Sequence, residues 1–168
     1  MTKTRIKKWN RTISKYIPNK ALLGVIFLFL AAWFVSTFFW QVMLLQGDSM
    51  EPAYHSGQFL ILDRHTGEYT YGDVVAVEKE GIEGYLVKRI VALPGDRVCI
   101  REGLFYVNGE AAGGYLQDIA YAGIAARELL LGEDQFFVLG DNLAESRDSR
   151  YPDIGAVDRN EIRGKVIR

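Results

Sequence analysis

Residues 21–45 contain no Asp, Glu, Lys, Arg or His, and this uncharged apolar run constrains the fold more than any other feature. At about 1.5 Å per residue, a helix of these 25 residues extends roughly 37 Å, more than the roughly 30 Å of hydrocarbon in a bilayer. A cleaved signal peptide has an apolar core of only about 7–15 residues followed by a small-x-small site. The run is too long for that, and residues 40–44 offer no such site. We therefore predict one transmembrane helix over residues 21–45.

Charge on either side of the run predicts its orientation. Residues 1–20 form a basic tail with seven Lys or Arg and no acid, which the positive-inside rule keeps in the cytoplasm. The other 13 Lys and Arg face 21 Asp and Glu, so residues 46–168 carry a net charge near −8. An acidic domain disfavours nucleic acid as a partner. We expect residues 46–168 to form one extracytoplasmic domain, with the lipid bilayer as a partner of the chain.

Beyond residue 46 the chain consists of short β-like runs broken by Gly, Asp and Pro, which predicts a mainly β domain with a single core. Asn108-Gly109 predicts a hairpin turn, and Pro94-Gly95-Asp96 predicts a second turn. Residues 119–131 fit a short helix, an irregular strand or an apolar flap equally well. The predicted strands are residues 58–63, 73–78, 85–92, 97–100, 104–107, 135–139 and 162–167.

Ser49 is a candidate nucleophile in a short polar turn directly after the apolar run. A serine hydroxyl reacts only when a neighbouring base takes its proton. The two histidines, His55 and His65, show no evident orienting partner, so a Ser-His-Asp triad is disfavoured. Taken alone, Ser49 fits an ordinary helix-end or turn serine better than a nucleophile. Near this turn, Met50 and Phe59 are candidates for contact with lipid, and Phe59 is an equal candidate for packing in the core.

Lys88 is the candidate base. Lys88-Arg89 interrupts an otherwise apolar run, so at least one of the two cations is expected to face a low-dielectric region. Burial and a nearby guanidinium both lower a lysine pKa, and a neutral lysine accepts a serine proton. The alternative is a charge that points outward from an edge strand. Cys99, the single cysteine, lies in a strand-like run and reads as a buried apolar residue, and no Cys/His cluster predicts a metal or cofactor.

A third segment, residues 140–150, packs two hydroxyls, three carboxylates and two guanidiniums into a loop after a predicted strand. Such loops are often simply solvated. They also form charge networks that support an active site.

Together these segments resemble the type I signal peptidases, membrane-bound serine proteases of the S26 group. Gly-Asp-Ser49-Met50-x-Pro52 is similar to the nucleophile box of that family, and the run from Lys88 to Asp96 is similar to its base box. Gly140-Asp141-Asn142 through Ser146-x-Asp148-Ser149-Arg150 is similar to its final box, and Gly72-Asp73-Val74-Val75 to a recurrent strand entry. The resemblance implies an antiparallel β catalytic domain tethered by one N-terminal transmembrane helix.

The resemblance also implies roles for individual residues. Ser49 would be the nucleophile, Lys88 the general base, and Ser146 the hydroxyl that orients the lysine amine. The amide of Ser49 would supply one oxyanion donor. Ion pairs around the site would be formed by Arg89, Asp141, Asp148 and Arg150.

The chain departs from the family pattern at several positions. Some members carry a hydroxyl two residues before the nucleophile as a second oxyanion donor, where this chain has Gly47. Ala53 replaces a usual threonine, and Leu143-Ala144 replaces a commonly charged pair. The chain lacks the large second domain of longer bacterial relatives. It is therefore similar to the short forms, which include enzymes of conjugation systems that mature pilin precursors.

The resemblance implies a serine endopeptidase of the bacterial inner membrane that removes signal peptides after a small-x-small site. Its partners would be preproteins emerging from the export machinery. A catalytically silent membrane-anchored assembly factor on the same scaffold is the alternative, and it need not keep Ser49, Lys88 and Ser146 together. A self-cleaving regulator of the LexA type would need a DNA-binding module in place of the apolar run.

Overall fold

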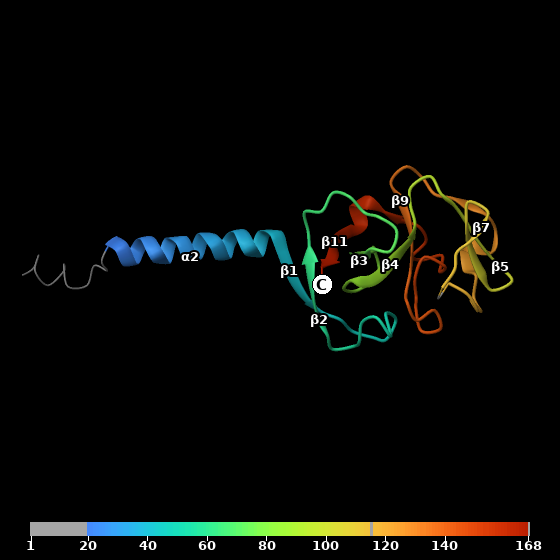
Figure 1. Cartoon of the computed structure of the whole chain (residues 1–168), viewed down its shortest axis with the longest axis horizontal. Helices are drawn as coiled ribbons and strands as arrows, with labels where there is room; N and C mark the ends of the chain where they lie inside the picture. The colour runs from blue at the N-terminus through green and yellow to red at the C-terminus, as the bar shows by residue number, and fades with distance from the viewer. Residues whose placement is uncertain (1–19, 115, 168) are drawn as a thin grey trace, which may run out of the picture. The chain divides into compact units, whose positions relative to one another are not determined.

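The computed structural model describes residues 20–114 and 116–167, and the chain divides into two units between Phe39 and Trp40. The first unit contains helix α2 (Lys20–Phe39), labelled in Figure 1. None of the helices formed by the described residues is long and apolar enough to cross a membrane. Of the predicted basic tail, residues 1–19 lie outside the described part of the chain.

The predicted helix over residues 21–45 is wrong at its C-terminal end. The helix stops at Phe39, and strand β1 (Trp40–Leu44) follows at once. All five residues of β1 pair with strand β2 (Phe59–Asp63), in antiparallel register from Trp40–Asp63 to Leu44–Phe59. An uncharged sequence is compatible with either a helix or a strand, and here the partner strand supplies the backbone hydrogen bonds.

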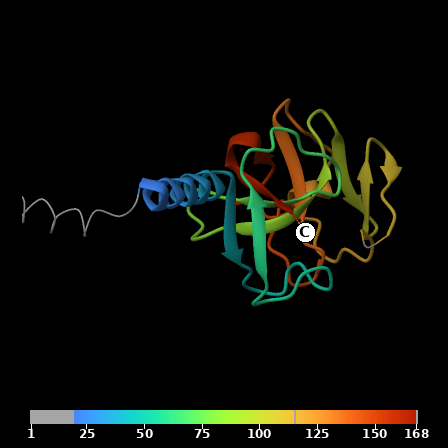
Figure 2. The same ribbon diagram turned by 60° about the vertical axis from the view of Figure 1, so that its left-hand side comes forward.

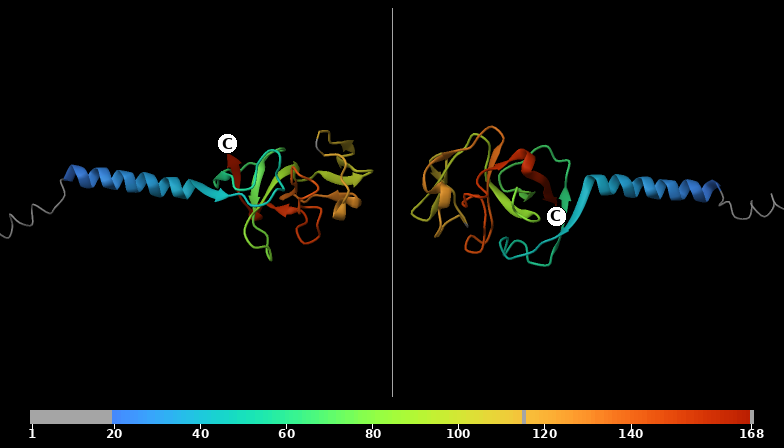
Figure 3. Two further views of the ribbon diagram at one scale, coloured as in Figure 1. Left: turned by 90° about the horizontal axis from the view of Figure 1, so that it is seen from below. Right: turned by 180° about the vertical axis from the view of Figure 1, so that it is seen from behind.

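The second unit is built on a seven-stranded antiparallel sheet in the order β1-β2-β11-β3-β4-β9-β10. Figures 2 and 3 show the early strands (cyan and green) beside the C-terminal strand (red). The chain therefore closes on itself, with β11 between β2 and β3. The further strands of this sheet are β3 (Val74–Val77), β4 (Leu86–Ala92), β9 (Gln135–Leu139), β10 (Val157–Asp158) and β11 (Ile162–Ile167).

A smaller four-stranded sheet has the order β7-β6-β5-β8. Its strands are β5 (Arg97–Arg101), β6 (Leu104–Val107), β7 (Glu110–Ala111) and β8 (Leu129–Leu130). The predicted hairpin turn at Asn108-Gly109 is confirmed, since both residues have positive φ and Val107 pairs with Glu110. The turn at Pro94-Gly95-Asp96 is confirmed by the Asp96 N–H, which donates to the carbonyl of Leu93 at 3.1 Å.

All seven predicted strands are present, with ends that differ by no more than one residue. The short strands β7, β8 and β10 were not predicted, because two residues are too few to show an alternating pattern. The ambiguous residues 119–131 form the 3₁₀ turn η1 (Gly123–Ala126) and strand β8. A second 3₁₀ turn, η2 (Arg159–Glu161), precedes β11.

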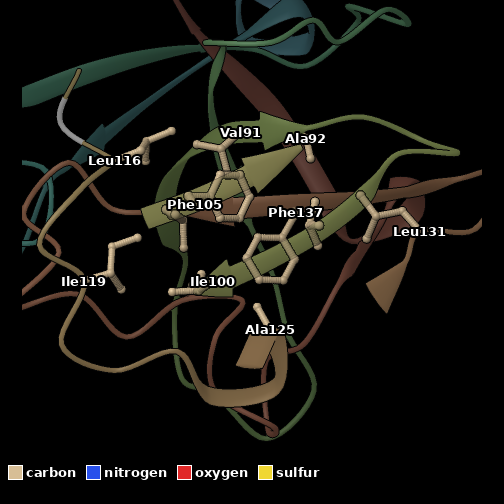
Figure 4. Close-up of a cluster of buried hydrophobic side chains, with 11 residues drawn as sticks. Val91, Ala92, Ile100, Phe105, Leu116, Ile119, Ala125, Leu131 and Phe137 are labelled. Atoms are coloured by element: carbon tan, nitrogen blue, oxygen red, sulfur yellow. The ribbon is translucent and has the colours of Figure 1, made fainter. Parts of the chain in front are cut away.

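A buried apolar cluster joins the two sheets, as Figure 4 shows. Its centre is the stacked pair of Phe105 on β6 and Phe137 on β9, whose ring centroids lie 5.7 Å apart. Ile119, Ala125 and Leu131 pack into the same cluster. Residues 119–131 are thus part of the core that holds the smaller sheet against the larger one.

One face of the large sheet presents apolar side chains to the outside. Phe59 is 72% exposed, and β1, β2 and β11 pair so that Ile61 lies between Val42 and Ile167. Met50 is fully buried, so its predicted contact with lipid is wrong. We call this surface the outer apolar face, and it consists of Trp40, Val42, Leu44, Phe59, Ile61 and Ile167.

Candidate active site

The candidate nucleophile Ser49 lies in a loop, residues 46–57, whose ends are held together. The N–H of Leu45 donates to the carbonyl of Gln58 at 2.8 Å, and the N–H of Gly57 donates to the carbonyl of Leu45 at 2.8 Å. Met50, the next residue, is fully buried in a cluster with Tyr54. Because its neighbour is anchored in the core, Ser49 is fixed with its own side chain half-buried.

The candidate base Lys88 lies on β4, between β3 and β9, where the sheet is covered on both faces. Its side chain is only 3% exposed, and its Nζ donates a hydrogen bond to Ser49 Oγ at 2.7 Å. The pKa of Lys88 is lowered from 10.5 to about 8, chiefly by burial; Arg150 adds to the shift, and the negative charges of Asp148 and Asp141 oppose it.

This geometry can carry out nucleophilic catalysis. Near pH 8 about half of the Lys88 amines are neutral, and a neutral amine accepts the hydroxyl proton of Ser49 over the same 2.7 Å contact. A serine whose proton has an acceptor at this distance is an activated nucleophile. The alternative of an outward-pointing charge on an edge strand therefore does not describe Lys88.

Ser146 is also buried close to the pair, at 3% exposure. Its Oγ has no hydrogen-bond partner among the described residues, so the predicted hydrogen bond to the Lys88 amine is not formed in this structure. An unpaired buried hydroxyl costs stability unless a ligand, water or rotamer change satisfies it. Ser146 is therefore a free donor beside Ser49.

Gly140 explains how Ser146 and Ser49 come so close together. A Cβ at residue 140 would lie 2.3 Å from Ser146 Oγ and 2.4 Å from the carbonyl oxygen of Ser49. The N–H of Asn142 donates to the same Ser49 oxygen at 3.0 Å. The loop after β9 thus packs directly on the backbone of the nucleophile, and only glycine fits at the contact.

Gly140→Ala is expected to lower the free energy of unfolding by about 1–3 kcal/mol, because the backbone oxygen of Ser49 cannot rotate away from the added methyl group. Displacing Ser49 from Lys88 by about 1 Å is expected to reduce kcat about 100-fold. Chemical denaturation and peptide-cleavage assays measure the two effects. Gly113→Ala is the matched control, because a Cβ there meets nothing within 4 Å. A fully active Gly140→Ala protein would contradict this account of the loop.

Arg89, the neighbour of Lys88, faces a different partner. Its Nε and Nη2 donate to the two carboxylate oxygens of Asp141 at 2.7 and 2.6 Å, and its Nη1 donates to the carbonyl of Gly72 at 2.7 Å. A bidentate pair of this kind fixes the plane of the guanidinium relative to the plane of the carboxylate. It ties β4 to the loop that begins at Gly140.

Arg150 and Asp148 form the most deeply buried ion pair of the site, at 2% and 0% exposure. Arg150 Nε and Nη2 donate to the Asp148 carboxylate at 2.8 and 3.0 Å. The same Nη2 donates to the carbonyls of Leu143 at 2.8 Å and Ser146 at 3.1 Å. The Asp148 carboxylate also accepts from the N–H of Gly140 at 3.2 Å. The pair therefore holds both ends of the loop that carries Ser146.

Two residues near the start of η1, Tyr121 before it and Ile124 within it, also hold Arg150 in place. The carbonyl of Tyr121 accepts from Arg150 Nη1 at 3.4 Å, and the N–H of Ile124 donates to the carbonyl of Arg150 at 2.9 Å. The Tyr121 ring lies 4.8 Å from the ring of Tyr151. No sequence motif predicted this role, because the contacts join segments more than 25 positions apart through backbone groups.

The alternative nucleophile and bases lie elsewhere. His55 Nδ1 is 3.2 Å from Glu51 on the exposed side of the loop, and the N–H of His65 donates to Asp63 at 2.9 Å. Cys99 is a buried free thiol on β5. Within residues 20–114 and 116–167 no group of three or more His, Cys, Asp or Glu side chains is arranged to hold a metal ion.

Residues 19–168 match the family described as signal peptidase, peptidase S26. The chain belongs to this family. It is 30% identical to signal peptidase I of Bacillus licheniformis over 173 aligned positions, which cover 96% of this chain and 91% of the relative. It is 33% identical to signal peptidase I of Bacillus caldolyticus, over 80% of this chain and 85% of the relative. The chain is therefore a serine protease of the signal peptidase I type.

The fold agrees with a solved relative. The crystal structure of a signal peptidase I from Enterococcus faecalis V583 superposes with a TM-score of 0.51 at 27% identity. The match covers 62% of this chain and the whole of that structure. The mainly β antiparallel architecture expected from the sequence is confirmed.

The backbone N–H groups around Ser49 differ in whether an acceptor occupies them. Among the described residues the N–H of Ser49 donates to no hydrogen-bond acceptor, so it is free to meet a substrate oxygen. The N–H of Gly47 is occupied, since it donates to Ser56 Oγ at 3.1 Å. Gly47 has a φ of +85°, which a residue with a side chain adopts only with strain. The turn at Gly47, where some family members carry a hydroxyl donor, is thus built for glycine.

A cavity of about 450 Å³ opens at Ser49 and Lys88. Ser49 and Lys88 both line it, and most of the other lining residues had no predicted role. Three separate segments contribute these residues, so only the folded chain brings them together. They are Met43, Leu44, Leu45, Gln46, Gly47 and Asp48 before Ser49, Glu83, Gly84, Tyr85, Leu86 and Val87 before Lys88, and Glu145 and Arg147 from the loop after β9.

The pH dependence of cleavage follows from Lys88. Since only the neutral amine accepts a proton, kcat/KM is expected to rise about tenfold per pH unit below a pKa of about 8 and to level off above it. Initial rates with one peptide between pH 6 and pH 10 measure this profile. A profile that levels off near pH 6.5, the range of an ordinary histidine, would exclude Lys88 as the base.

Proposed function

We propose that this peptidase removes signal peptides from exported preproteins with a Ser49–Lys88 dyad, cutting after a small-x-small site. The observation that supports it most is the 2.7 Å hydrogen bond between Lys88 Nζ and Ser49 Oγ, made by a lysine that is 3% exposed and has a pKa of about 8. A buried lysine hydrogen-bonded to a half-buried serine fits general-base catalysis without histidine.

In the proposed mechanism, Ser49 Oγ attacks the scissile carbonyl carbon while its proton passes to Lys88 Nζ. The N–H of Ser49 stabilises the developing oxyanion. The Lys88 ammonium then gives the proton to the leaving amine, which departs and leaves an acyl group on Ser49. Water attacks this ester as Lys88 takes a proton from it, and the proton returns to Ser49 Oγ when the carboxylic acid product is released. After a rotamer change, Ser146 Oγ would accept a hydrogen bond from an N–H of Lys88, which leaves the nitrogen lone pair directed at Ser49.

The ion pairs are proposed to hold this arrangement rather than to react. Arg89 with Asp141, and Arg150 with Asp148, fix the loop that carries Ser146 against β4 and the nucleophile turn. Burial is the main cause of the lowered pKa of Lys88, and the charges of these pairs modify it: Asp148 and Asp141 raise it and Arg150 lowers it.

We further propose that the chain is a single-pass protein of a bacterial inner membrane, with residues 1–20 cytoplasmic and the catalytic domain extracytoplasmic. The uncharged sequence of residues 21–45 and the basic tail support the anchor and its orientation. The outer apolar face, with Phe59 at 72% exposure, supports contact with the bilayer interface.

Preproteins delivered by the export machinery would be the partners. An extended peptide that lies in the cavity can place alternate side chains toward the protein, and shallow space near Ser49 favours small ones. A narrower role in maturing conjugative pilin precursors is part of the proposal, because the chain is similar to the short forms of the family. The complete dyad disfavours a catalytically silent assembly factor.

The test is cleavage of full-length precursors, one of them a pilin precursor, by the full chain in detergent, with product termini read by mass spectrometry. Cuts after small-x-small sites are the expected result, and the preferred precursor separates a general from a specialised role. If the folded protein cuts no precursor, the silent assembly factor is correct.

A further inference from the structure

We propose that the catalytic cavity prefers peptides with a cationic side chain close to the cleavage site, and that Glu83 and Glu145 determine this preference. The proposal rests on the proposed function, since it concerns the substrate of the same site. It arises from charges that the dyad mechanism does not use.

Three carboxylates from three separate segments line this one cavity. Asp48 precedes the nucleophile, Glu83 lies in the loop between β3 and β4, and Glu145 lies in the loop after β9. All three side chains are exposed, and none forms an ion pair with a residue that the structure describes. Their charges are therefore available to a ligand.

The cavity contains two cations, and neither balances these carboxylates. Arg147 pairs with Asp153 outside the cavity lining, and its guanidinium lies 5.9 Å from the Tyr151 ring centroid. Lys88 bonds to Ser49, and it must lose its charge to act as a base. In the reactive state the cavity thus carries three uncompensated negative charges.

The cavity is a peptide site independently of these charges, because Ser49 and the buried Lys88 both line it. Apolar groups form the remainder of its wall, among them Leu45, Leu86 and Val87. A Lys or Arg side chain has an apolar stem and a charged end, so it can cover this wall while its charge reaches the carboxylates. A Glu in the same place would meet like charges.

The expected size of the preference follows from the exposure of the carboxylates. One exposed ion pair changes an equilibrium about two- to fivefold, and two or three acting together give about tenfold at low ionic strength. Salt screens such pairs, so the preference should shrink as ionic strength rises.

The experiment measures binding without turnover. The full-length Ser49→Ala protein in zwitterionic micelles is titrated with fluorescent small-x-small peptides in which Lys, Gln or Glu is scanned through every other position around the scissile bond. At one or more positions we expect the Lys peptide to bind about tenfold more tightly than the Glu peptide. Cleavage of the same peptides by the unaltered protein reports on the proposed function separately.

Substitutions of the cavity carboxylates test which residues cause the preference for a cationic side chain. In Glu83→Gln/Glu145→Gln the Lys-to-Glu ratio of affinities should fall to within about twofold, and in Glu83→Lys/Glu145→Lys it should invert. Glu80→Gln is the matched control, since Glu80 is exposed in the same loop but does not line the cavity, and it should keep the full ratio. A ratio within twofold at every position, or one that survives the double Gln substitution, would overturn the proposal.

Discussion

Ser49→Ala is expected to lower kcat for precursor cleavage by about 10⁴-fold or more while the protein stays folded. The substitution removes the hydroxyl to which Lys88 Nζ donates a hydrogen bond at 2.7 Å. The fold should persist because the loop is held by backbone groups and by Met50, including the hydrogen bond from the Asn142 N–H to the Ser49 carbonyl. Single-turnover cleavage and thermal unfolding measure the two properties.

Thr66→Ala is the matched control for this result. Thr66 is another half-buried hydroxyl, but it bonds within its own loop, to the carbonyl of Glu68. Its removal should leave cleavage within about twofold of the unaltered protein, as for most substitutions outside special sites. If Ser49→Ala retained more than a tenth of the original rate, Ser49 would not be the nucleophile.

Lys88→Met should abolish cleavage to a similar extent and at the same time stabilise the protein near neutral pH. Methionine has a similar length but cannot accept a proton, so the activated serine is lost. The stabilisation has a separate cause. A folded-state pKa of about 8 against 10.5 means that burying the charged lysine costs about 3 kcal/mol.

The sign of the stability change follows from proton linkage. Because the folded pKa is lower, the unfolded chain binds more protons between pH 8 and 10.5, and the cost is fully present below about pH 8 and disappears as the pH rises through that range. After subtracting about 1 kcal/mol for the lost hydrogen bond to Ser49, Lys88→Met should be about 2 kcal/mol more stable at pH 7. The gain should vanish above about pH 10.

Denaturation of Lys88→Met and the unaltered protein at pH 7 and pH 10 checks this prediction. Lys79→Met is the matched control, because Lys79 is a partly buried lysine that pairs with Glu161 at 2.8 Å, and its removal should not stabilise. A Lys88→Met protein that is less stable than the unaltered protein at pH 7 would show that burial does not destabilise the charged form of Lys88.

Local patterns were sufficient to predict most of the strands. Residues 104–107, 135–139 and 162–167 are strands with the expected ends, because alternation and turn residues act over a few positions. The same reasoning was wrong for residues 40–44, because hydropathy does not distinguish an apolar helix from an apolar strand. Their state depends on pairing with β2, nineteen positions further along the chain.

The candidate site was predictable in part. Ser49, Lys88 and the residues around Ser146 were predicted from their motifs and their resemblance to a family, and at least one of Lys88 and Arg89 was expected to face a low-dielectric region. Ser146 was expected to bond to Lys88, yet its hydroxyl is unpaired. A hydrogen bond depends on distances of a few tenths of an ångström, and a motif does not specify these.

The sequence by itself determined the chemical groups of this protein: a serine, a lysine within an apolar run, and an uncharged segment beside a basic tail. Only the tertiary structure decided that Lys88 lies 2.7 Å from Ser49, that Gly140 allows the loop after β9 to reach them, and that Glu83 and Glu145 share their cavity. The reason is that residue type is a property of each position, whereas reactivity depends on burial and distance. Those arise when strands far apart in the chain pair in one sheet and exclude water from the groups between them.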